Sequence, residues 1–394
     1  MAQVIGSIVR VAACVALFLG AQAWPGTAMA RTNDGPAVPP ESDVPIALLV
    51  DISSGQVLHA RNADRRFVPA SITKVMTTFL AFELIEDGAL DTAQVITVSE
   101  ETAREWSGKG SSMWVDPGDR ILVADLLTGI ANVSANDGAI VLAEGHAGSV
   151  EGWTAMMTAK AREIGMLASH FGTPNGWPDN GYTFTTANDL VTLARTMITR
   201  HPLKFANFVG RPGFSYNGRT QRNRDPITGQ VDGADGIKTG YTNESGFGFL
   251  GTASRRGQRL VMVLGGAYSS SVRDRYARSY IEWGFSAFDR QRLFESEQVV
   301  GIARIQNGDR RELQLVTDRT VFVNVPEKAT EALSARIFYD GPLRAPIAAG
   351  ERVATLEITV PGMEPARLPL LAGTEVRKAG FFARITNAIA RWLA

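Results

Sequence analysis

The sequence has 394 residues, 45% of them apolar and 20% charged, which excludes disordered and fibrous classes and predicts a soluble protein of two domains plus tails. Basic and acidic side chains number 40 each, so the overall charge gives no reason to expect a nucleic-acid partner. Any informative charge must therefore be local.

The N-terminal segment has the pattern of an export signal. Arg10 precedes an apolar run at residues 11–23, and the small residues on either side of Met29 predict cleavage after Ala30. A single-pass anchor is the alternative, but the run is short for a membrane span. The only cysteine, Cys14, lies in this segment, so the mature chain excludes disulfides, thiol catalysis and cysteine metal sites.

Folding is expected to begin after a proline-rich linker at residues 31–44. Residues 46–51 and 57–59 predict a β-hairpin that turns at Gly55. The apolar run at residues 75–85 follows soon after, and it is typical of a helix buried in a core.

Ser71 and Lys74 stand at the start of this helix. Three residues apart, they lie on one helical face, so the lysine amine can reach the serine hydroxyl and take its proton. A serine at a helix start is also a common N-cap, and a lysine one turn later is usually solvated. The pair alone is therefore not specific for catalysis.

A helical middle follows, with helices predicted at residues 124–130, 138–145, 150–165 and 190–199. The first two flank a short polar break at residues 133–137. Residues 170–181 are rich in glycine, proline and asparagine and predict a loop. Thr186 and Asp189 have the spacing of a helix cap.

Strands return at residues 236–241, 246–254 and 260–267, and we expect them to join the first hairpin in one antiparallel sheet. A helix at residues 273–288 has aromatic residues at helical spacing and should pack on that sheet. The pattern then changes to short alternating strands, which predict a separate β-sandwich with strands at 299–305, 313–317, 321–325, 333–339, 352–360 and 367–371.

The last segment predicts an amphipathic helix. Residues 381–394 place apolar and aromatic side chains on one arc, with Arg377, Arg384 and Arg391 on its flank, which suits the surface of an anionic membrane. A terminal helix docked on its own domain is the alternative. The predicted organisation is a signal peptide (1–30), a linker (31–44), an α/β domain (45–293), a β-sandwich domain (294–375) and the amphipathic helix (376–394).

Three short motifs occur in order along the α/β domain: Ser71-x-x-Lys74, Ser134-x-Asn136 and Lys238-Thr239-Gly240. Separately, each has an ordinary structural explanation as a helix cap or a surface lysine. Together, they are the signature of penicillin-binding proteins and class A β-lactamases. The histidines show no metal-binding spacing, and the Gly-x-Gly-x-x-Gly sequence that starts at Gly246 lies within a strand, so neither indicates a metal or dinucleotide site.

On these motifs the chain resembles the D-alanyl-D-alanine carboxypeptidases of the low-molecular-mass penicillin-binding protein family. The resemblance covers nearly the whole chain, including residues 235–240, the β-domain and the tail. It implies an α/β (α+β) transpeptidase-like domain with an antiparallel sheet and a helical subdomain, a small all-β domain and a C-terminal amphipathic helix. Ala135 stands where the family usually has glycine, and Tyr241 where many members have histidine, which affects fine substrate preference rather than the reaction.

The resemblance also implies roles for individual residues. Ser71 would be the nucleophile, Lys74 its neutral general base, and Ser134 a proton relay to the leaving amine. The N–H groups of Ser71 and Tyr241 would form the oxyanion hole. Substrate would be held by Asn136, Lys238, Thr239, Gly240 and Arg273.

The implied reaction removes the terminal D-alanine from peptidoglycan stem peptides, with β-lactams as covalent inhibitors and without a cofactor or metal. The implied location is the periplasm, peripheral on the outer face of the cytoplasmic membrane through the C-terminal helix. Three alternatives stay open at this point: a β-lactamase, a D,D-endopeptidase acting on crosslinks, and a non-catalytic scaffold of the cell envelope.

Overall fold

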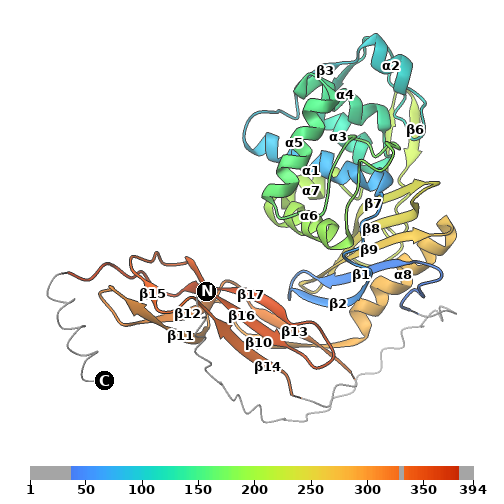
Figure 1. Cartoon of the computed structure of the whole chain (residues 1–394). Coiled ribbons are helices and arrows are strands. Elements are labelled where there is room, and N and C mark those ends of the chain that lie inside the picture. The colour runs from blue at the N-terminus through green and yellow to red at the C-terminus, as the bar shows by residue number, and fades with distance from the viewer. Residues whose placement is uncertain (1–36, 328–331, 381–394) are drawn as a thin grey trace, which may run out of the picture. The chain divides into compact units, whose positions relative to one another are not determined.

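The computed structural model describes residues 37–327 and 332–380, which divide into two compact units (Figure 1). One unit comprises residues 37–53 and 58–286, and the other begins at residue 287 and includes residues 54–57. The predicted signal peptide at 1–30 and the apolar arc of the tail at 381–394 lie outside the described residues. Within the part of the chain described, no helix is both long enough and apolar enough to span a bilayer.

The first unit is built on a five-stranded sheet with the strand order β2-β1-β9-β8-β7. The pairs β1–β9, β8–β9 and β7–β8 are antiparallel, with Ile46 opposite Gly265 at one end of the first pair. This confirms the prediction that the first hairpin joins the later strands. The strands are β1 (Ile46–Asp51), β2 (Gln56–Arg61), β7 (Ala234–Thr242), β8 (Gly246–Arg255) and β9 (Gln258–Ala267).

The helical part of this unit surrounds α1, which contacts α3, α5 and α6. Phe79, Leu80 and Phe82 of α1 are buried although they point to different sides of the helix, as its apolar sequence predicts. Thr186 caps α6, because its hydroxyl accepts a hydrogen bond from the N–H of Asp189 (3.1 Å). The helices are α1 (Lys74–Glu86), α2 (Glu100–Trp106), α3 (Val123–Asn132), α4 (Asn136–Ala147), α5 (Val150–Glu163), α6 (Ala187–Arg200), α7 (Pro202–Phe208) and α8 (Ser270–Ser286).

Several short elements were not predicted. They are the helices α2 and α7 and two hairpins, formed by β3 (Val95–Thr97) with β4 (Arg120–Leu122) and by β5 (Gly213–Tyr216) with β6 (Arg219–Arg222). Strands of three or four residues are too short to show an alternating pattern in the sequence. Their pairing is fixed by the tertiary contacts around them.

The second unit is all-β, as predicted. Its larger sheet has the order β14-β16-β17-β12-β11-β15, and β10 pairs with β13 in a smaller one. Leu315, Leu356 and Leu370 of the larger sheet share one core with Val323 of β13. The strands are β10 (Phe288–Phe294), β11 (Val299–Gln306), β12 (Glu312–Thr317), β13 (Val321–Pro326), β14 (Ser334–Phe338), β15 (Leu343–Arg344), β16 (Arg352–Thr359) and β17 (Ala366–Ala372).

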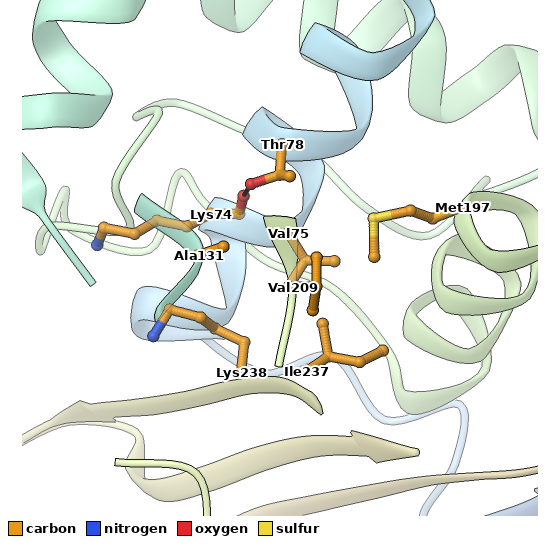
Figure 2. A pocket seen from close by; sticks show the side chains of 8 residues that line it. All are labelled: Lys74, Val75, Thr78, Ala131, Met197, Val209, Ile237 and Lys238. Carbon is orange, nitrogen blue, oxygen red and sulfur yellow. Dashed lines mark hydrogen bonds between the residues drawn. The ribbon is translucent and has the colours of Figure 1, made fainter. Parts of the chain in front are cut away.

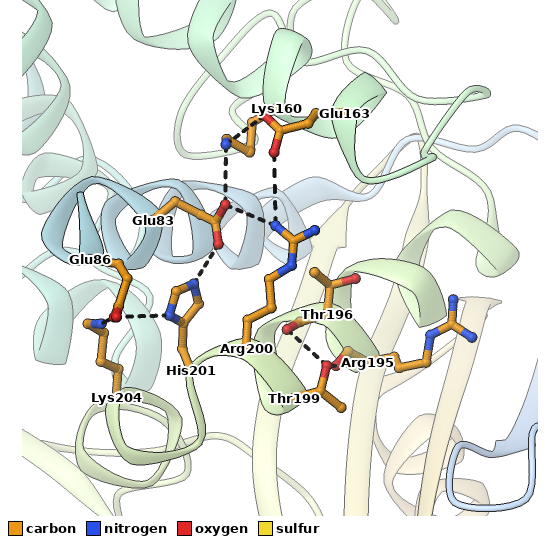
Figure 3. A network of polar contacts seen from close by, with 10 residues as sticks. All are labelled: Glu83, Glu86, Lys160, Glu163, Arg195, Thr196, Thr199, Arg200, His201 and Lys204. Atoms are coloured by element: carbon orange, nitrogen blue, oxygen red, sulfur yellow. Dashed lines mark hydrogen bonds and ion pairs between the residues drawn. The ribbon is translucent and has the colours of Figure 1, made fainter. Parts of the chain in front are cut away.

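A network of charged side chains ties α1 to its neighbouring helices (Figure 3). Glu83 of α1 accepts a hydrogen bond from His201 (2.6 Å) and pairs with Lys160 (3.2 Å) and Arg200 (3.1 Å). Burial alone would raise the pKa of Glu83, but the hydrogen bonds from His201 and Lys160 and the charges of Lys160 and Arg200 together hold it below its ordinary value. The ionised carboxylate is therefore the form that stabilises this packing.

Replacing Glu83 with glutamine should lower the free energy of unfolding at pH 7 by about 2 kcal/mol, because three donors lose a charged acceptor. The folded-state pKa lies below the unfolded value near 4.5, so the contribution is present above pH 4.5 and is lost as the pH falls through the folded pKa. The melting temperatures of the two proteins should therefore differ at pH 7 and converge as the pH falls through the folded-state pKa of Glu83. Glu163→Gln, which removes a more exposed partner of Lys160, is the matched control and should cost less than about 0.5 kcal/mol.

Candidate active site

Lys74 is fully buried, and its amine has three oxygen neighbours. Nζ lies 3.0 Å from Ser71 Oγ, 2.7 Å from Asn136 Oδ1 and 2.5 Å from the backbone carbonyl of Asn175. The first two contacts bring together residues of two predicted motifs. The third comes from the glycine- and proline-rich loop, for which the sequence suggested no role in the site.

Ser71 lies in a 3₁₀ turn (Ala70–Thr73) directly before α1. Ala70 has a φ of +50°, a conformation that costs energy for a residue with a side chain and that clusters at functional sites. Two glycines allow chain segments to approach this turn closely. A Cβ on Gly176 would lie 1.9 Å from the Ala70 carbonyl oxygen, and one on Gly240 would lie 2.5 Å from the Pro69 carbonyl oxygen. The turn is thus held between the loop and strand β7.

The second motif lies at the start of α4. Asn136 is buried, and its Nδ2 donates to the Lys109 carbonyl (2.9 Å) while its Oδ1 faces Lys74, so its amide orientation is fixed from both sides. Ser134 has a φ of +66° in the break between α3 and α4. Among the described residues, its hydroxyl makes no hydrogen bond to Ser71 or Lys74. The relay predicted for Ser134 therefore requires substrate or water to complete it.

The third motif contributes a second buried lysine. Lys238 of β7 is 5% exposed, and burial lowers its pKa to about 7, helped by the nearby charges of Arg224 and Arg273 and opposed by Asp225. Burial also lowers the pKa of Lys74 well below its ordinary value, and the charge of Lys238 adds to this effect while Asp137 opposes it. Burial therefore favours the neutral form of both amines.

An apolar cavity lies beside the two lysines (Figure 2). Its volume is about 10 Å³, which is room for at most one water. In Figure 2 both amines point to the same side, away from Met197 and Ile237 in the cavity wall. The cavity therefore borders the aliphatic parts of the two side chains rather than their amines.

The remaining predicted residues lie along β7 and at the start of α8. Arg273 is 7% exposed, and its charge acts on Lys238, so the structure brings this most distant candidate to the site. Its guanidinium pairs with Asp274 (2.7 Å) and faces the Phe247 ring. Tyr241 is half exposed and stacks on Phe247 with 4.1 Å between ring centroids. Thr239 lies between Lys238 and Gly240 on the same strand.

Four residues of the site were not predicted. The charge of Arg224 lowers the pKa of Lys238 and that of Asp225 raises it. Asn175 accepts a hydrogen bond from Lys74 through its backbone carbonyl. Asp137 accepts from Ser112 Oγ (2.5 Å) and from backbone N–H groups at 113 and 114, which fixes residues 112–114 against α4. Only Asp137 carried a sequence signal, as the carboxylate next to the Ser134-x-Asn136 motif.

Comparison with known proteins assigns both units. Residues 34–269 match the family described as D-alanyl-D-alanine carboxypeptidase, and residues 288–378 match the C-terminal domain of penicillin-binding protein 5. D-alanyl-D-alanine carboxypeptidase DacC of Escherichia coli is 30% identical over 391 residues, which cover 97% of this chain and 96% of the relative. DacD of Salmonella typhimurium is 31% identical over 357 residues, which cover 89% of this chain and 90% of the relative.

Solved structures show the same architecture. Penicillin-binding protein 5 from Haemophilus influenzae superposes with a TM-score of 0.75 at 26% identity, covering 86% of this chain and 99% of that one. Penicillin-binding protein D2 from Listeria monocytogenes, solved in the ampicillin-bound form, has a TM-score of 0.56 at 26% identity and covers 62% of this chain and 98% of that one.

Proposed function

Because the chain belongs to the D-alanyl-D-alanine carboxypeptidase family, we propose that Ser71 is the nucleophile that releases the terminal D-alanine from peptidoglycan stem peptides. The protein is a serine peptidase of the D-Ala-D-Ala type and a penicillin-binding protein. The observation that carries the assignment of Ser71 is the contact between its Oγ and the buried amine of Lys74 (3.0 Å).

The proposed reaction has two steps. Neutral Lys74 takes the Ser71 proton as Oγ bonds to the carbonyl carbon between the two D-alanines, and the N–H groups of Ser71 and Tyr241 stabilise the oxyanion. The C–N bond then breaks, and Ser134 relays the proton held by Lys74 to the departing D-alanine amine, which leaves Lys74 neutral again. Water hydrolyses the resulting ester and regenerates Ser71.

Two groups of residues, on opposite sides of Ser71, are proposed to bind the substrate: one binds its terminal carboxylate and the other its amide. Lys238, Thr239 and Arg273 would hold the terminal carboxylate, which only a C-terminal residue possesses. Gly240 would let β7 lie close to the Ser71 turn, in keeping with the 2.5 Å that a Cβ there would leave to the Pro69 carbonyl oxygen. Asn136 would hold the amide on the other side of the cleaved bond.

Ser71→Ala should abolish both labelling by a fluorescent penicillin and release of D-alanine from a pentapeptide that ends in D-Ala-D-Ala. Wild-type protein should release D-alanine and keep its penicillin adduct through many minutes of washing. Rapid hydrolysis of penicillin with no D-alanine release would instead indicate a β-lactamase. Labelling retained by Ser71→Ala would exclude Ser71 as the nucleophile.

We further propose export through the signal at residues 1–30 and attachment to the outer face of the cytoplasmic membrane through residues 376–394. The support is the small-residue cleavage pattern before Arg31 and the arginines that flank the apolar arc of the tail. Fractionation of cells that express the chain with and without residues 376–394 tests the second part. A truncated protein that stays with the membrane would contradict it.

A further inference from the structure

A cluster of two tryptophans and a lysine borders Asn136. The Lys109 ammonium lies over the Trp106 ring, 4.1 Å from its centroid, and 5.2 Å from the centroid of Trp177. The two indoles meet edge to face with 5.7 Å between centroids. Trp106 ends α2 and Trp177 follows Asn175 in the loop, so two segments distant in sequence converge on one cation.

The cluster is joined to the catalytic residues through Asn136. The Lys109 carbonyl accepts from Asn136 Nδ2 (2.9 Å), and the opposite end of the same amide contacts Lys74. A Cβ on Gly110 would lie 2.9 Å from Asn136 Nδ2 and 3.1 Å from the Trp177 ring, so the indole is next to this amide. A substrate held by Asn136 therefore passes the cluster as it continues beyond the amide.

The direction of the substrate decides which part of it reaches the cluster. The proposed function places the terminal carboxylate at Lys238 on β7, and Asn136 on the other side of the cleaved bond. The portion that reaches Trp177 and Lys109 is then the acyl portion, upstream of the two D-alanines. These residues would then contact only the part of the substrate that stays bound to Ser71 after D-alanine leaves.

We propose that Trp106, Lys109 and Trp177 form a subsite for an acidic residue in the upstream part of the stem peptide, with the Lys109 ammonium pairing to its carboxylate. This inference rests on the proposed function of the site. The two indole faces hold the ammonium in place before substrate arrives, which reduces the entropy lost on binding. The two indole rings would also supply apolar contact to the substrate next to the ammonium.

Lys109 already pairs with a carboxylate, that of Glu105, which a substrate carboxylate could replace. Glu105, four residues earlier in the sequence, lies 3.4 Å from the ammonium, but its side chain is 53% exposed, whereas that of Lys109 is 34% exposed. An exposed pair of this kind contributes little to stability. A substrate carboxylate can therefore replace Glu105 at low cost, and Glu105 acts as a competitor for the cation.

The test uses two synthetic pentapeptides that differ in one group. L-Ala-γ-D-Glu-L-Lys-D-Ala-D-Ala carries a free α-carboxylate on its second residue, and the D-isoglutamine form carries a carboxamide there. The wild type should show a kcat/KM for the acidic peptide that is about five-fold higher, as expected for one partly exposed ion pair. Lys109→Met should bring the ratio to about one, and Glu105→Gln should raise it.

A matched control is Lys204→Met, which removes another partly buried lysine that pairs with an exposed glutamate, Glu86, away from the site. Its ratio should equal that of the wild type. Added NaCl should reduce the wild-type preference, because salt screens an exposed pair. A wild-type ratio of one, or a preference retained in Lys109→Met, would overturn the subsite. Failure of the wild type to release D-alanine from either peptide would overturn the proposed function as well.

Discussion

Lys74→Arg is expected to reduce acylation of Ser71 by a fluorescent penicillin by about 10²- to 10⁴-fold, the usual contribution of a general base. Arginine keeps a positive charge at position 74 and can still donate hydrogen bonds. The variant therefore tests whether Lys74 is needed as a base or only as a positive charge. A guanidinium does not lose its proton in the accessible pH range and cannot accept one from Ser71.

The hydrogen-bond count at Lys74 gives the physical reason. A neutral amine has two N–H donors and one lone pair, and the structure provides two obligate acceptors, the Asn136 Oδ1 and the Asn175 carbonyl. The third neighbour is the Ser71 hydroxyl, which can donate as well as accept. Two donors used on the carbonyl oxygens leave the lone pair facing the hydroxyl proton. Burial and the charge of Lys238 favour this neutral form by lowering the pKa of Lys74.

The measurement is the rate constant of labelling at pH 7, with thermal melts to verify that the variant is folded. Ser71→Ala serves as the zero point. Acylation of Lys74→Arg at the wild-type rate would show that another group takes the Ser71 proton, and Lys74 would then be a structural residue.

Much of this site could be predicted from the sequence, because each motif is short and its internal geometry is local. The spacing of Ser71 and Lys74 is set by one turn of helix, and the helix itself is marked by its apolar run. The large sheet could be predicted for a similar reason, since its strands are long and bounded by turns. Arg273 is the exception among the predicted residues, because it lies outside the three motifs and only the resemblance to the family suggested it.

The residues that were missed reach the site through tertiary structure. Asn175 acts through a backbone carbonyl, a group that every residue has, so its side chain carried no signal. Arg224 and Asp225 come from the segment after the short β5–β6 hairpin, which lacked a recognisable pattern. In the second unit, β10 was missed because the sequence Phe-Asp-Arg-Gln-Arg-Leu-Phe follows α8 without a turn signal, and much of the strand is exposed or half-buried.

The pH dependence of kcat/KM is expected to be bell-shaped, because the proposed reaction needs a neutral Lys74 and a charged Lys238. Activity should rise as Lys74 loses its proton and fall as Lys238 loses its own, with the alkaline limb near pH 7, where Lys238 titrates in the free enzyme. The alkaline limb of kcat should lie at higher pH, because a bound substrate carboxylate stabilises the ammonium form of Lys238. Since the two amines interact, the limbs report the pair in two macroscopic steps.

Two substitutions at position 238 distinguish the limbs. Lys238→Arg should remove the alkaline limb of kcat/KM, because the guanidinium stays charged, and should leave the acid limb in place. Lys238→Gln should lower kcat/KM by about 10²-fold, the loss expected for one charged hydrogen bond to the substrate carboxylate. It should also move the acid limb to higher pH, because the cation that lowers the pKa of Lys74 is gone. An alkaline limb that persists near pH 7 in Lys238→Arg would assign that titration to a different group.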